Sequence, residues 1–79
     1  MTFTDEQLEI LYRAAVLARK DLGQVLTPDA YPAADELAEA GWLERRSERN
    51  GDMSWWWTPV AGTTLDLNAL LQSAVGRQN

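Results

Sequence analysis

The pair Asn50-Gly51 constrains the fold most, because it separates two runs with the composition of β-strands. The first run, at 42–46, reads WLERR, and the second, at 54–58, reads SWWWT. Asn-Gly favours a two-residue type I′ turn, in which both central residues take positive φ angles. We therefore predict an antiparallel hairpin with strands near 42–47 and 53–58.

A two-residue turn also predicts which side chains face one another across the hairpin. It places Arg45 opposite Trp56, and a bulge would alter this register. Because side chains alternate between the two faces of a strand, Trp55 and Trp57 share one face and Trp56 lies on the other. We expect Trp56 to be partly exposed, with Arg45 stacked over its ring as a cation–π pair.

Helix signals flank the hairpin on both sides. Thr4 and Gln7 form a capping-box pattern, and apolar residues then recur at helical spacing as far as Gly23, which predicts a helix over 5–22. Thr27-Pro28 suggests a short turn, and Tyr31-Pro32 opens a second helix, predicted near 33–40. A last helix is predicted near 64–75, capped by Thr63 or Thr64 and ended by Gly76. The order indicates an α+β fold in a single domain, 1–79.

Only a small core is possible in 79 residues, of which 46% are hydrophobic. The apolar stripes of the predicted helices and the start of the first strand supply it. The predicted core is Leu8, Leu11, Ala15, Leu37, Leu43, Leu67, Leu70 and Leu71.

The chain lacks the residues on which several classes of protein function usually depend. It contains no cysteine and no histidine, no glycine-rich phosphate loop and no calcium-binding loop pattern. We therefore expect no enzyme activity, no cofactor and no metal. No apolar run is long enough for a bilayer span, and the N-terminal MTFTDEQ is acidic where a signal peptide is basic, so we expect a cytoplasmic protein.

Negative charge is concentrated in the first part of the chain. The net charge is −5, and residues 1–44 contain nine acidic and three basic side chains. The second predicted helix carries Asp35, Glu36 and Glu39. This arrangement fits either a solvated helix face or a carboxylate cluster presented to a basic partner. It argues against specific DNA binding, because DNA-binding surfaces carry a basic face that neutralises phosphates.

The order of elements and two local segments resemble winged-helix proteins. AGWLERR at 40–46 resembles the end of the recognition helix and the start of the wing in MarR-type and PadR-type regulators, and TPVAG at 58–62 resembles the start of the helix after the wing. The resemblance implies that 33–40 is the recognition helix. That segment contains carboxylates and no Arg, Lys, Asn or Gln, the side chains that read bases. A DNA-contacting role therefore carries over instead to the wing arginines, Arg45, Arg46 and Arg49. The alternative is a solvated hairpin in which these arginines pair locally with Glu44, Glu48 and Asp52.

Three functional hypotheses follow. In size, charge and scaffold the chain resembles small acidic phage proteins of the anti-CRISPR type. That resemblance implies an inhibitor in the host cytoplasm that blocks a basic, nucleic-acid-binding protein surface through Asp35, Glu36, Glu39 and Trp56. The alternative is a small transcriptional regulator that uses the wing arginines, and the third hypothesis is a docking scaffold that uses an exposed tryptophan face. The chain is expected to be a monomer or a homodimer.

Overall fold

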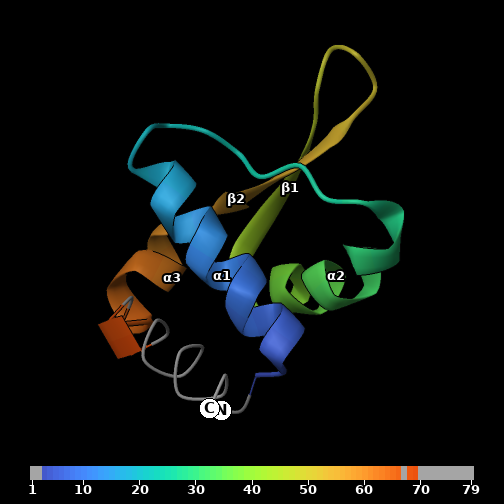
Figure 1. Ribbon diagram of the computed structural model, residues 1–79. Helices are drawn as coiled ribbons and strands as arrows, with labels where there is room; N and C mark the ends of the chain where they lie inside the picture. Colours follow the sequence, from blue (N-terminus) through green and yellow to red (C-terminus); the bar gives the residue numbers. More distant parts are fainter. Residues whose placement is uncertain (1–2, 67, 70–79) are drawn as a thin grey trace.

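The computed structural model describes residues 3–66, 68 and 69, and it confirms the α+β class (Figure 1). A long helix crosses in front of a two-stranded antiparallel sheet, and the other helices lie on either side of it. This order is compatible with a winged-helix-like topology. The elements are α1 (Asp5–Ala18), the 3₁₀ helix η1 (Pro28–Ala30), α2 (Tyr31–Glu39), β1 (Leu43–Ser47), β2 (Met53–Trp57) and α3 (Pro59–Thr64).

Helix α1 begins at the predicted capping box. The Thr4 hydroxyl accepts from the Gln7 backbone N–H at 3.1 Å, and the Gln7 side chain accepts from the Thr4 N–H at 3.0 Å. The helix ends at Ala18 rather than near residue 22, so the predicted end was wrong. Asp21 takes a φ of 56°, and the N–H of Leu22 then bonds the carbonyl of Leu17 at 3.0 Å, which closes the helix before Gly23.

The segment after α1 runs along the outer edge of β2 and is fixed there by one bridge. Gln24 donates to the Trp55 carbonyl at 2.9 Å, and Trp55 donates to the Gln24 carbonyl at 2.8 Å. Both bonds join backbone atoms. This bridge adds a single residue pair of a third strand to the sheet.

Helix α2 begins two residues earlier than predicted, directly after η1. Pro32 occupies its first turn, where the missing N–H has no intrahelical partner to lose. Gly41 has a φ of 91°, and beside it the N–H of Trp42 bonds the carbonyl of Leu37 at 3.0 Å. This left-handed closure reverses the chain from α2 into β1.

The hairpin is confirmed, but its predicted register was wrong by one residue. Arg45 faces Trp55 rather than Trp56, and Glu44 faces Trp56. The connection is a three-residue loop, 49–51, in which only Gly51 is left-handed, with a φ of 89°. The Gly51 N–H donates to the Glu48 carbonyl at 3.0 Å. This loop is the common alternative to the two-residue turn, a type I turn followed by a glycine bulge.

Helix α3 precedes the helix predicted near 64–75, and Thr58 caps it. Thr63 and Thr64, the predicted caps of that later helix, lie inside α3, so the predicted cap was wrong. The Thr58 hydroxyl accepts from the Ala61 N–H at 3.1 Å. It also donates to the carbonyl of Gly41 at 2.6 Å, so one side chain joins the start of α3 to the start of β1. Most of the helix predicted near 64–75 lies outside the described residues.

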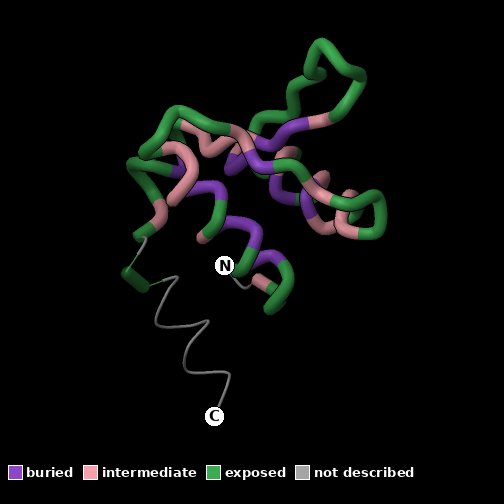
Figure 2. Tube along the Cα trace, turned by 45° about the horizontal axis from the view of Figure 1, so that its top comes forward, coloured by how far each residue is buried: buried purple, intermediate pink, exposed green. Residues whose placement is uncertain are grey.

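The core lies between the sheet and the helices α1 and α2 (Figure 2). Burial of Leu8, Leu11, Ala15, Leu37 and Leu43 is confirmed, whereas Leu67, Leu70 and Leu71 lie outside the described residues. The structure adds members that the predicted core omitted. These are Ile10, Ala14, Ala34, Trp42, Trp55 and Ala61. Within the described part of the chain, no helix has the length and apolar character needed to cross a membrane.

Candidate functional site

Helix α2 buries one face and presents its carboxylates on the other. Ala34 and Leu37 are 0% and 2% exposed and pack into the core. Glu36 and Glu39 are exposed, and Asp35 is half-buried at the edge of the helix facing β1. The helical period therefore separates the apolar stripe from the acids, as the sequence predicts. The three carboxylates nevertheless have three different environments.

Asp35 forms an ion pair with Arg45 of β1. The guanidinium lies 3.2 Å from the carboxylate, and the two side chains, Arg45 and Asp35, are 51% and 48% exposed. Together with Ala38 and Glu39 they line a shallow hollow between α2 and the strand. The structure thus joins a residue proposed to bind a protein partner with one proposed to contact DNA. An ion pair with this exposure contributes little to stability, because water screens it.

Glu36 is held by the first turn of α1. Its carboxylate accepts a hydrogen bond from the Gln7 side-chain amide at 2.8 Å. Gln7 is itself fixed by the capping box, so one side chain caps α1 and orients a carboxylate on α2. Sequence reasoning assigned Gln7 only the first of these roles. No local pattern predicts the second, because the two residues are far apart in the chain.

Glu39 forms no side-chain hydrogen bond or ion pair with any other described residue. Asp29 adds a further acid directly before α2, and a hydrogen bond from the Thr27 side chain, helped by the backbone N–H of Asp29, lowers its pKa. Among the residues that the structure describes, no group of three or more acidic side chains is placed to hold a metal ion.

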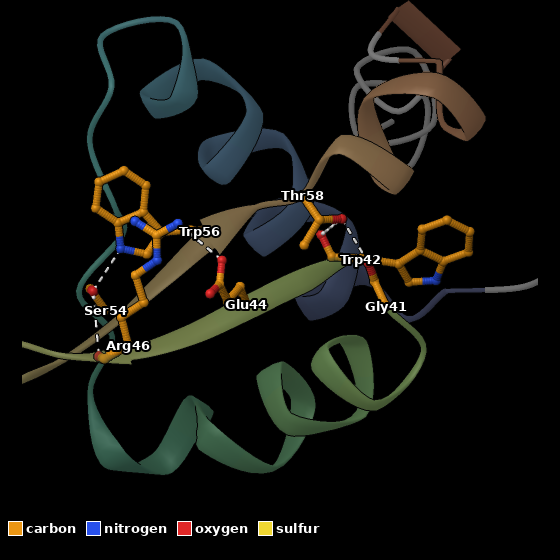
Figure 3. Close-up of polar contacts among 7 residues, drawn as sticks. All are labelled: Gly41, Trp42, Glu44, Arg46, Ser54, Trp56 and Thr58. Carbon is orange, nitrogen blue, oxygen red and sulfur yellow. Dashed lines mark hydrogen bonds and ion pairs between the residues drawn. The ribbon is translucent and has the colours of Figure 1, made fainter.

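Trp56 lies on the face of the sheet opposite the buried Trp55, and it is half-buried, as predicted. The arginine over its ring is Arg46 and not Arg45, since the register differs by one residue. The Arg46 guanidinium lies 4.2 Å from the ring centroid and 3.0 Å from the Glu44 carboxylate (Figure 3). The Arg45 guanidinium lies 5.8 Å from the centroid of the Trp55 ring.

Two further contacts fix the Trp56 indole. Its Nε1–H donates to the Ser54 hydroxyl at 2.8 Å, and Ser54 is 2% exposed (Figure 3). The other neighbour is Gly23, where a methyl group would lie 2.4 Å from the Trp56 Nε1 atom. Gly23 was predicted to stop α1, but its position requires glycine because the indole fills the space of a side chain.

Arg49 stands apart from the other two wing arginines. It lies in the hairpin loop, which projects away from the helices (Figure 1). The residue is exposed, and its side chain forms no hydrogen bond or ion pair with the rest of the described chain. It lines an open hollow beside the segment 23–25. Of the three wing arginines, Arg49 alone has its charge free for a partner within the described structure.

The chain matches no protein-family model, no curated protein and no solved structure.

Proposed function

We propose that this protein is a non-enzymatic binding module that engages a basic, nucleic-acid-binding surface of another protein, as an inhibitor of the anti-CRISPR type. The observation that carries the proposal is the surface of α2. At the position that the winged-helix resemblance assigns to a recognition helix, its solvent-facing charges are Asp35, Glu36 and Glu39. Phosphates would be repelled by this helix, whereas lysines and arginines of a protein would be attracted.

The contacts around the carboxylates support this assignment. Gln7 orients Glu36 without neutralising it, because an amide donor carries no charge. Glu39 is free within the described chain, and the Asp35–Arg45 pair is exposed enough to exchange for a partner cation. Trp56 supplies apolar surface on the sheet, although Arg46 covers one face of its ring. We expect the carboxylates to set the association rate and Trp56 to slow dissociation.

The test replaces the three carboxylates by amides of the same shape, in the variant Asp35→Asn, Glu36→Gln, Glu39→Gln. The amide oxygen introduced at position 36 can still accept from the Gln7 side chain, so this contact between α1 and α2 is retained. The readout is inhibition of DNA binding by a panel of purified RNA-guided effector complexes. We expect the triple amide variant to associate with the effector complex about tenfold or more slowly than the parent at low salt, since electrostatic steering is lost.

The matched control is Glu9→Gln, Glu48→Gln, Asp66→Asn, which removes three exposed acids outside α2 and gives the same net charge. It should inhibit like the parent. Equal inhibition by the parent and the α2 variant at low salt contradicts the role of the carboxylates. Absence of inhibition across the whole panel contradicts the anti-CRISPR assignment.

The alternative function, a DNA-binding regulator, is favoured by one observation: Arg49, near the projecting tip, pairs with none of the residues that the structure describes. Because Arg45 and Arg46 are engaged by Asp35 and Glu44, Arg49 would carry most of the DNA contact. We expect no specific duplex binding at physiological salt. Salt-sensitive binding that disappears in the Arg45, Arg46, Arg49 triple alanine variant, and largely in Arg49→Ala alone, would support the regulator instead.

A further inference from the structure

The hairpin tip places an asparagine carboxamide directly before a glycine. Asn50 and Gly51 are both exposed, and the loop stands clear of the helices (Figure 2). The other asparagines precede Ala69 or end the chain, so Asn50 is the one asparagine in the sequence followed by glycine. Glycine leaves the following backbone nitrogen unshielded, because it has no side chain.

This pair of residues can react without a catalyst. The Gly51 backbone nitrogen attacks the Asn50 side-chain carbonyl carbon and forms a C–N bond. The Cγ–Nδ2 bond breaks, and ammonia leaves with the proton that the Gly51 nitrogen gives up. The product is a five-membered cyclic imide. Water then opens the ring at either carbonyl, giving aspartate or isoaspartate, and no electrons are gained or lost.

The folded tip engages the Gly51 nitrogen and both polar atoms of the Asn50 carboxamide in hydrogen bonds. The Gly51 N–H donates to the Glu48 carbonyl at 3.0 Å, so the nucleophile is engaged. The Asn50 Nδ2 donates to the Asp52 carboxylate at 3.0 Å, and the Asn50 Oδ1 accepts from the Asp52 backbone N–H at 3.0 Å. Ring closure therefore requires the tip to open first.

We propose that Asn50 is a self-modification site, which converts to aspartate or isoaspartate with water as the co-reactant at a rate restrained by the Asp52 side chain. The conversion does not depend on the proposed function. It replaces the Nδ2 donor, 3.0 Å from the Asp52 carboxylate, by an oxygen that repels it. The product therefore has a weakened tip beside Arg49 and one additional negative charge.

The test incubates the whole protein in mildly alkaline buffer and follows intact mass and peptide maps over days. We expect the mass gain of amide hydrolysis at Asn50. It should form several-fold faster in urea and several-fold faster in folded Asp52→Ala than in the folded parent. Asp52→Asn keeps a side-chain acceptor for Nδ2, so it should react at nearly the parent rate.

Asn50→Gln is the negative control, since a longer side chain disfavours ring closure, and its tip should not react. An unreacted Asn50 in urea overturns the site. Equal rates in the folded parent and in folded Asp52→Ala overturn the restraint by Asp52. Circular dichroism of each folded variant distinguishes a specific loss of the Asp52 contact from general unfolding.

Discussion

At the scale of single residues, the Trp56 indole can occupy its position because Gly23 has no side chain. A Cβ at residue 23 would overlap its indole ring. The Nε1–H donates to the Ser54 hydroxyl, and the Arg46 guanidinium lies over the ring. Because closely packed side chains transmit displacement to their neighbours, moving this ring away from Gly23 also disturbs its contacts with Ser54 and Arg46 and therefore costs free energy. The outer face of the sheet therefore depends on a residue in the loop after α1.

We expect Gly23→Ala to lower the free energy of unfolding by about 1–3 kcal/mol, through overpacking against Trp56. Urea denaturation followed by tryptophan fluorescence measures it. The matched control is Gly62→Ala in α3, where the added methyl would lie 3.4 Å from the Trp57 Nε1, an ordinary contact. The control should be neutral or slightly stabilising, since alanine favours helix. Equal losses in both variants would contradict the packing account.

At the scale of elements, the Thr58 side chain connects α3 to the turn between α2 and β1. Its hydroxyl donates to the carbonyl of Gly41, with the Trp42 carbonyl 3.3 Å away (Figure 3). The same hydroxyl accepts from the Ala61 N–H. One side chain therefore caps α3 and holds the glycine turn that leads into β1. Loss of this hydroxyl affects two elements together.

We expect Thr58→Val to cost about 1–2 kcal/mol of unfolding free energy, because the variant keeps the shape but loses the cap and leaves a carbonyl unpaired. Thr63→Val is the control, since the Thr63 hydroxyl donates to the Val60 carbonyl on the exposed side of the same helix. Its effect should stay within about 0.5 kcal/mol. A chemical denaturation series of both proteins decides between them.

Some features of these helices and of the hairpin can be predicted from the sequence, and others cannot. Caps and turn residues are local signals, so the start of α1 and the existence of the hairpin were predicted correctly. Asn-Gly suits both a two-residue turn and a three-residue loop, and the choice depends on bonds such as that between Asn50 and Asp52. The one-residue error then assigned the wrong arginine to Trp56. The Gln7–Glu36 contact could not be predicted, because it needs the packing of two distant helices.

At the scale of the whole molecule, a single small core supports every surface described above. Leu11 and Trp55 are both 0% exposed and belong to the cluster that joins α1, α2 and the sheet. A domain of this size retains only a few kcal/mol of net stability. Damage at the centre of the core should therefore remove the α2 face and the hairpin together.

We expect Leu11→Ala to lower the free energy of unfolding by about 2–5 kcal/mol, the range for deleting a fully buried leucine. Leu22→Ala makes the same chemical change at a position that is 50% exposed, and it should cost less than about 1 kcal/mol. Both values come from urea titrations at equal protein concentration. A loss below about 1 kcal/mol for Leu11→Ala would contradict its central place in the core.

The bridge between Gln24 and Trp55 has a consequence for how chains of this kind diverge. Both of its hydrogen bonds join main-chain atoms, so almost any residue except proline preserves them at position 24. Position 24 is therefore constrained by the burial of its side chain and not by the side chain's part in the bonds. Gly23 beside it is constrained differently, because the Trp56 indole leaves no room for a Cβ there.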